Sequence, residues 1–363
     1  MQLNMQLCSE IFNLKDEFCN EAQKVWQAYN GRKDISLLQQ QLRYALINNH
    51  FSEQGSGVLN EIVSSISKTS QAQADIYAVC ALGALLPEAL AYYRRIGASD
   101  SVARASLGDV GRWIDNYAIT HNGAYGINEF SWAVHTFAGN LFEIGSLQYQ
   151  MRTNRMPYYI YMYRGKLVAV PQQGLNISAD GHLYGTNGTH NDIAFTTELY
   201  ERDNCIIANK VNDEAAIITQ EKIELNINEA KLITACGMPI LFVHIPKNTD
   251  LSMSAVESSL SEAKQFFTKL NYPCTVGMCC SWILDAEQKS IMKQDGNLAK
   301  FSAKFTHFPL YNVCYSGGRF VFNVDYTSDD LHNVVPQTSL AKKMHQHLLQ
   351  GKELYEAGGA ILL

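Results

Sequence analysis

The sequence contains no block of basic residues. Lysine and arginine together number 29 against 35 aspartates and glutamates, which gives a formal net charge of −6 at pH 7. Proteins that bind nucleic acid concentrate positive charge on one face, whereas the basic residues here are scattered singly. We therefore expect no nucleic-acid partner. An anionic ligand would need a local feature such as the start of a helix.

The sequence also lacks a long apolar run. The first 18 residues mix amide and charged side chains and have no apolar core of the kind found in signal peptides. The longest apolar run, Tyr77–Leu86, is about half the length that spans a bilayer. We expect a cytoplasmic protein without a membrane partner.

The cysteines show no metal-binding spacing. There are nine of them, an odd number, and no two form a Cys-x-x-Cys pair. A site built from Cys274, Cys279 and Cys280 would lack the usual ligand spacing. We expect reduced thiols in a cytosolic protein, and no metal cofactor.

What the sequence does have is enough apolar material for more than one core. Hydrophobic residues make up 47% of the 363 residues, a length that suggests two domains. The pattern changes near Gly145, so we expect an α+β protein with a helical N-terminal domain at 1–145 and a mixed domain at 146–363. No flexible linker separates them, and we expect the two domains to pack together.

Apolar residues recur at helical spacing between residues 34 and 141, for example at Leu59, Ile62 and Ile66. Asp75, Asp100 and Asn128 stand where helix N-caps are expected. This part of the chain is therefore predicted to be helical.

After Gly145 the pattern favours strands. Tyr158–Tyr163 and Lys166–Val170 flank a turn at Arg164-Gly165, and Asp180-Gly181 and Asn187-Gly188 are further turn signals. Further strands are expected at 194–199, 205–211, 216–219 and 319–326.

One segment predicts a strand, a helix and a second strand. Pro239–Ile245 is a short apolar run, Ser254–Glu257 matches a capping box at the start of a helix ending at Leu270, and Thr275–Trp282 is the second run. A crossover of this length favours parallel strands. His244 and Ser281 would then lie at the same edge of the sheet, where open α/β sheets bind their ligands.

Several segments of the chain share a family pattern: Ala105–Trp113, Gly126–Trp132, Ala179–Gly181, Gly185–Gly188, Val243–Pro246, Glu262–Phe267, Cys279–Asp285, Asn297–Phe305 and Pro336–Leu340. On these segments the chain resembles bacterial acyltransferases that join an N-acyltransferase N-terminal helical domain to a GNAT-like C-terminal domain. The resemblance covers nearly everything after residue 40. It implies a GNAT-like sheet, acyl-CoA as the donor co-substrate, and a small-molecule or peptide amine as the acceptor.

The chain departs from the family pattern at two places. The GNAT pyrophosphate loop, Gln/Arg-x-x-Gly-x-Gly/Ala, is absent between the predicted strand and helix. The family also has Cys-His-Ser-Trp where this chain has Cys279-Cys280-Ser281-Trp282. A histidine that matters chemically would be missing there, with altered or lost activity as the consequence.

The candidate catalytic residues lie at the two strand ends. Imidazole is suited to deprotonating an amine near neutral pH, which makes His244 the candidate general base. Ser281 could protonate the leaving thiolate or orient the carbonyl, and Cys280 could be an acylated nucleophile. Each has an ordinary structural alternative: a hydrogen-bonded histidine, a packed hydroxyl and a small buried thiol.

Candidate cofactor-binding residues follow the first strand. The loop and helix start, represented by Ile245, Thr249, Ser252 and Ser254, could hold the CoA pyrophosphate on backbone N–H groups. Glu129, together with Trp132, could hold the acceptor amine in a cleft between the domains, or simply satisfy a helix dipole.

Three functions remain open from the sequence. The first is direct acyl transfer from acyl-CoA to an amine. The second is a non-catalytic protein that binds acyl-CoA or another ligand on the same fold. The third is a covalent acyl-enzyme, transferase or hydrolase, formed through Cys280 or Ser281.

Overall fold

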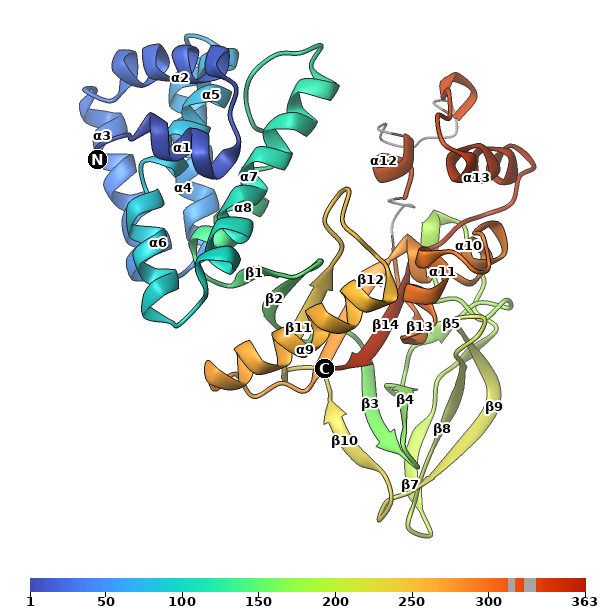
Figure 1. Cartoon of the computed structure of the whole chain (residues 1–363). Coiled ribbons are helices and arrows are strands. Elements are labelled where there is room, and N and C mark those ends of the chain that lie inside the picture. Colours follow the sequence, from blue (N-terminus) through green and yellow to red (C-terminus); the bar gives the residue numbers. More distant parts are fainter. Residues whose placement is uncertain (313–316, 323–330) are drawn as a thin grey trace. The chain divides into compact units, whose positions relative to one another are not determined.

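The computed structural model describes residues 1–312, 317–322 and 331–363 (Figure 1). The chain divides into two compact units. The helical unit contains residues 1–150 and 245–249, and the sheet unit contains residues 151–244 and 250–363. A short segment that follows a strand of the sheet unit therefore belongs to the helical unit.

The helical unit is an assembly of short and medium helices. These are α1 (Met5–Phe12), α2 (Asp16–Tyr29), α3 (Lys33–Arg43), the π-helix η1 (Tyr44–Asn48), α4 (Ser52–Ser67), α5 (Gln71–Gly83), α6 (Leu86–Arg95), α7 (Asp100–Thr120) and α8 (Phe130–Phe137). A hairpin follows, in which β1 (Leu141–Ile144) pairs antiparallel with β2 (Leu147–Thr153).

Helix α5 is buried on all sides, with residues 74–83 inside the core. Gln71–Arg95, which comprises α5 and α6, is long and apolar enough to cross a membrane by length and composition alone. Its most apolar window has a mean hydropathy of 1.5, and 78% of that window is buried inside the protein. Burial in the core of the unit accounts for this composition.

Three expected helix caps are displaced. The cap of α5 is Ser70, so the prediction for Asp75 is wrong: its buried carboxylate lies inside the helix and accepts a hydrogen bond from Tyr117 at 2.7 Å. The cap of α7 is Ser99 rather than Asp100. Glu129, not Asn128, holds the N-cap position of α8. A cap depends on which oxygen reaches the helix N–H groups, and a sequence pattern does not predict this to the exact residue.

The first part of the sheet unit consists of small antiparallel sheets. One contains β3 (Tyr158–Tyr163), β4 (Lys166–Pro171) and β10 (Lys231–Thr234), in the order β10-β3-β4. Another contains β7 (Leu199–Arg202), β8 (Cys205–Asn212) and β9 (Ile217–Asn226), and β5 (Asn176–Ile177) pairs with β6 (Phe195–Thr196). The turn at Arg164-Gly165 has positive φ at both residues, as its sequence predicts.

The predicted strand–helix–strand segment is confirmed. β11 (Pro239–His244) and β12 (Val276–Ser281) pair in parallel, and α9 (Met253–Lys269) connects them. β12 also pairs antiparallel with β14 (Ala357–Leu362), which in turn pairs with β13 (Thr306–Pro309). The α+β class is therefore confirmed: a helical N-terminal region precedes a mixed α/β sheet domain.

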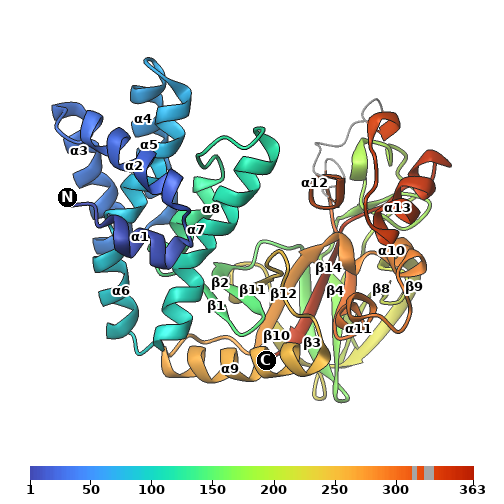
Figure 2. The same ribbon diagram turned by 45° about the horizontal axis from the view of Figure 1, so that its top comes forward.

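Short helices complete the sheet unit. They are η2 (Thr186–Gly188), η3 (Trp282–Leu284), α10 (Ala286–Ile291), α11 (Asn297–Ser302), α12 (Gly317–Phe322), η4 (Leu331–Asn333) and α13 (Ser339–Leu349). Helices α10 and α13 lie side by side in both views (Figures 1 and 2). Their common core includes Ile291, Met344 and Leu348.

Two predicted strands are wrong in whole or in part. The stretch 194–199 is interrupted at Thr197, whose buried hydroxyl accepts from Leu175 N–H and donates to the Gln172 carbonyl. Within 319–326, residues 319–322 belong to helix α12, and the rest lies outside the described residues. Val321 and Phe322 pack against the apolar cluster of α10 and α13, so tertiary contacts override their β propensity.

Candidate functional site

The carboxyl ends of β11 and β12 meet at one edge of the sheet. Leu241 pairs with Gly277 and Phe242 with Met278, an offset of 36 positions in each case. The same offset makes His244 correspond to Cys280, with Ser281 one position further along β12. The structure therefore ends both strands at one edge of the sheet, as expected from parallel strands, with His244 in register with Cys280 and Ser281 next along β12.

His244 is half-buried at the end of β11. Its ring lies 4.9 Å from the ring of Phe242, which points to the same face because side chains two apart in a strand share a face. The Arg152 guanidinium lies 5.3 Å from the centre of that Phe242 ring. A cation next to this aromatic pair places positive charge near the strand end, where an anionic ligand would benefit from it.

Cys280 is poorly suited to nucleophilic attack. Burial raises the pKa of its thiol well above the ordinary value, and the neighbouring Cys279 thiol raises it further. A cysteine nucleophile reacts as the thiolate, so a raised pKa removes the reactive form at neutral pH. Of the two interpretations of Cys280, the raised pKa favours the structural thiol over the acylated nucleophile.

Ser281 starts the turn that follows β12. Its Oγ accepts a hydrogen bond from Ile283 N–H at 3.2 Å and so caps the 3₁₀ helix η3. Because the oxygen acts as acceptor in this bond, its own hydrogen can still be donated to another group. The packed-hydroxyl role and a proton-donating role are therefore compatible in this geometry.

Asp285 follows η3 and was not among the expected site residues. Its carboxylate caps α10 by accepting from Glu287 and Gln288 N–H, and it also accepts from Tyr355 N–H at 3.1 Å. Burial raises its pKa to about 6 despite these three bonds. Asp285 is the last residue of the family segment Cys279–Asp285, and a carboxylate at that position is the signal that the sequence offers.

The start of α9 differs from the predicted capping box. The N-cap position is Ser252, and within the described part of the chain its side chain makes no cap hydrogen bond. Its hydroxyl donates to Asp250 Oδ2 at 2.9 Å instead, and its N–H donates to Asp250 Oδ1. Ser254 lies inside the helix, and Glu257 forms an ion pair with Lys304. The first-turn backbone N–H groups thus have no serine cap, whereas an aspartate stands just before them.

The segment between β11 and this loop lies in the helical unit. It includes Ile245 and Thr249, and the Thr249 hydroxyl donates to the Ser146 carbonyl. That bond anchors the segment to the β1–β2 turn. The structure therefore places Ile245 and Thr249 in one unit and Ser252 and Ser254 in the other.

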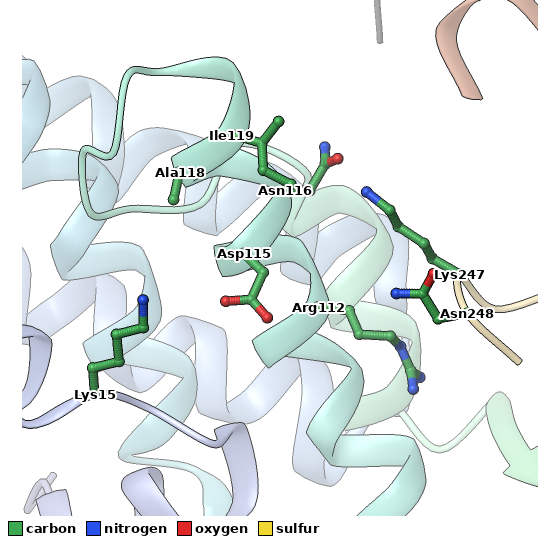
Figure 3. A pocket seen from close by; sticks show the side chains of 8 residues that line it. All are labelled: Lys15, Arg112, Asp115, Asn116, Ala118, Ile119, Lys247 and Asn248. Carbon is green, nitrogen blue, oxygen red and sulfur yellow. The ribbon is translucent and has the colours of Figure 1, made fainter. Parts of the chain in front are cut away.

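A pocket of about 480 Å³ opens beside this segment, within the helical unit. Lys247 and Asn248 form one wall and α7 forms another, as Figure 3 shows. The pocket is lined by Lys15, Arg112, Asp115, Asn116, Ala118, Ile119, Lys247 and Asn248. Its charged side chains are Lys15, Lys247, Asp115 and Arg112, and Arg112 is already paired with two carboxylates.

Two family segments of the helical unit meet at Asp109. This buried carboxylate on α7 accepts from the indole N–H groups of Trp113 and Trp132, at 3.1 and 3.0 Å. It also pairs with Arg112, which forms a second ion pair with Glu143 on β1. Trp132 is therefore held by α7, and nearby Glu129 occupies the N-cap position of α8.

The comparison with protein families accounts for almost the entire chain. Residues 5–139 match an N-acyltransferase N-terminal domain, and residues 141–361 match a GNAT-like C-terminal domain. The chain belongs to this acyltransferase family. The resemblance inferred from the sequence segments is thereby confirmed. No curated protein matches this family member.

Solved structures share its fold at low sequence identity. An acyltransferase mutant in complex with octanoyl-CoA has a TM-score of 0.62 at 15% identity, over 100% of this chain and 90% of that one. An acyltransferase in complex with decanoyl-CoA has a TM-score of 0.60 at 16% identity, over 100% and 89%. A third, with decanoyl-CoA and teicoplanin, has a TM-score of 0.53 at 15% identity, over 99% and 100%.

Proposed function

We propose that this protein transfers an acyl group from acyl-CoA to an amine in one direct step. The observation that carries the proposal is the parallel pairing of β11 and β12. Because the two strands end at the same edge of the sheet, His244 and Ser281 both stand at that edge. Membership of the acyltransferase family supports acyl transfer as the reaction proposed for that edge. Two solved acyltransferases of the same fold bind octanoyl-CoA and decanoyl-CoA, so acyl chains of eight and ten carbons are the first donors to test.

In this proposal the CoA pyrophosphate binds the first turn of α9. The backbone N–H groups of residues 253–255 begin the helix without a serine cap, and the helix dipole favours a negative charge there. Asp250 opposes an anion by its charge, and its bonds to Ser252 hold it in place. The pyrophosphate therefore depends on backbone donors rather than on the glycine loop that this chain lacks.

The chemical step needs a base and an acid. The amine nitrogen attacks the thioester carbonyl carbon, the C–N bond forms, and the C–S bond breaks. His244 takes the proton that the amine loses, and the Ser281 hydroxyl gives a proton to the leaving thiolate and recovers one from solvent. Positioning both groups on rigid strand ends supplies the orientation that the step requires.

The acceptor is the least specified part of the reaction. One solved acyltransferase of this fold is in complex with teicoplanin and decanoyl-CoA. We infer a small-molecule or peptide amine for the present protein and no particular compound. A mixed pool of amines and amino-terminal peptides is therefore the appropriate first substrate set.

The test follows CoA release from octanoyl- and decanoyl-CoA with this pool, using the full-length protein. Product amides are identified by mass spectrometry. His244→Ala is expected to lower the turnover by about 10²–10⁴-fold, the usual contribution of a general base, with acyl-CoA affinity little changed. His121→Ala, a change at an exposed histidine of the helical unit, is the matched control. Near-wild-type turnover in His244→Ala would exclude His244 as the base.

Two alternative functions give different results in the same assay. A covalent acyl-enzyme would show an acylated chain by intact mass, lost in Cys280→Ala or Ser281→Ala. The raised pKa of Cys280 disfavours the first of these. A protein that only binds acyl-CoA would be stabilised by it, by about 2.7 kcal/mol at a hundred times Kd, while releasing no CoA with any amine.

A further inference from the structure

A second cluster of ionisable side chains lies in the sheet unit, apart from the residues assigned to acyl transfer. Asp180 and His182 flank the tight turn at Gly181, and His190 follows the short helix η2. The Asp180 Oδ2 atom lies 3.2 Å from His182 Nδ1 and 3.1 Å from His190 Nδ1. One potential ligand atom from each of the three residues lies within 4.8 Å of those of the other two. From this geometry we propose a binding site for a divalent transition-metal ion of the zinc class.

The distances suit a tetrahedral ion. Zinc binds imidazole nitrogen and carboxylate oxygen at about 2.0–2.1 Å, so neighbouring ligand atoms are separated by roughly 3.3 Å. The two Asp180 contacts match that separation. Two imidazoles and one carboxylate favour zinc, cobalt or nickel over magnesium and calcium, which prefer all-oxygen sites.

Hydrogen bonding by itself does not satisfy the cluster. His182 Nδ1 is buried and has no hydrogen-bond partner among the residues that the structure describes, although it lies close to Asp180 Oδ2. A buried polar atom left in this state is costly. An ion placed between the three atoms would satisfy that nitrogen through its lone pair.

The surroundings also match a metal site. His190 Nε2 lies 3.2 Å from Glu353 Oε2, which can accept its N–H and leave Nδ1 free to coordinate. Without a metal, His190 would need a proton on each nitrogen to bond both carboxylates. A ligand histidine that donates its other N–H to a carboxylate is the usual arrangement in metal sites.

The backbone and its neighbours hold the ligands in place. Asp180 Oδ1 accepts from the Ser178 hydroxyl at 2.7 Å, which turns Oδ2 toward the histidines. The His182 ring stacks on Tyr355, with ring centres 3.9 Å apart. The side chains of His182 and His190 are only 14% and 11% exposed, whereas that of Asp180 is 46% exposed. The ion would thus have three protein ligands and a fourth position open to water.

The site would tie the loop of residues 180–190 to the segment that precedes β14. Glu353 and Tyr355 contact the two histidines, and Tyr355 N–H donates to Asp285. Metal binding should therefore stabilise this part of the sheet unit. The inference is independent of the proposed acyl transfer, since it uses none of the residues assigned to that reaction.

The test begins with metal-free full-length protein, prepared with a chelator and without an affinity tag. Zinc titrated by calorimetry should bind with one ion per chain and raise Tm by several degrees. Cobalt should give the intense visible absorption of a tetrahedral nitrogen and oxygen site. Asp180→Asn, His182→Ala and His190→Ala should each weaken binding by at least 100-fold, and Glu353→Gln by about 10–100-fold.

Cys236→Ser is the control for adventitious binding, because Cys236 is an exposed thiol. It should leave the affinity for zinc unchanged. Two results would overturn the proposal: a wild-type chain that binds no zinc at a few equivalents, or wild-type affinity in Asp180→Asn and both histidine variants. The absence of zinc binding by the wild-type chain would refute the proposal even if one of the variants failed to fold.

Discussion

Two aspartates, Asp109 in the helical unit and Asp180 in the sheet unit, collect polar partners in different ways. The partners of Asp109 are two indoles and a guanidinium, which can only donate at physiological pH. The partners of Asp180 are two imidazoles, which can donate, accept or bind a metal. The cluster around Asp109 is therefore a hydrogen-bonded structural cluster, whereas the side chains around Asp180 could also bind a ligand.

The largest effect on stability is expected at the cluster around Asp109. Asp109→Ala would leave the Trp113 and Trp132 indoles without their acceptor and remove one of the two carboxylates paired with Arg112. We expect a loss of about 3 kcal/mol in unfolding free energy, measured by urea denaturation. Asp180→Ala in metal-free protein should cost less than about 1 kcal/mol, because that side chain is 46% exposed. Equal losses of unfolding free energy in the two variants would contradict the different roles inferred for the two clusters.

A second prediction tests how tightly the helical unit is packed. A Cβ on Gly111 would lie 2.1 Å from the Phe12 carbonyl oxygen, a backbone atom that cannot move aside. Gly111→Ala should therefore destabilise the protein by about 2 kcal/mol. The control is Gly57→Ala on α4, where a Cβ would meet no atom of the described residues within 4 Å. That change should stabilise by about 0.5–1 kcal/mol through helix propensity. A loss in both variants would argue against the close approach of α7 to α1.

The smallest effect concerns pH and the sheet unit. The folded-state pKa of Asp285, about 6, exceeds its ordinary value of 3.8 because the carboxyl is buried. The folded state thus binds the proton more tightly, and wild type should gain stability as pH falls from 7 to 4. Relative to Asp285→Asn, which cannot titrate, the gain should be about 1–2 kcal/mol. Parallel stability curves for the two proteins between pH 4 and 7 would contradict the raised pKa.

The fold was largely predictable because its signals are local. Helical periodicity, the turn at Arg164-Gly165 and the alternation of apolar runs around α9 depend on residues close together in sequence. The predicted caps at Asp75 and Ser254 are wrong, because a cap is decided by single hydrogen bonds. Each depended on one hydrogen bond, and the aspartate instead faces Tyr117 while Glu257 faces Lys304.

The candidate site was predictable only in part. His244, Cys280 and Ser281 stand at the same edge of the sheet because parallel pairing follows from the strand–helix–strand pattern. Asp109 belongs to the family segment Ala105–Trp113, but the sequence does not reveal its role, because one of its two indole partners, Trp132, lies on another helix. The roles of His244, Ser281, Glu129 and the loop before α9 stay predictions until the variants are measured.

The sequence by itself determined the family, the α+β class and the edge of the sheet at which His244 and Ser281 end. These follow from patterns within single elements or from one crossover. Only the tertiary structure decided that Glu353 and Tyr355 lie against His182 and His190, and that Asp285 is buried. Such contacts join residues more than 60 positions apart, and the chain reaches them only when its packed core has formed.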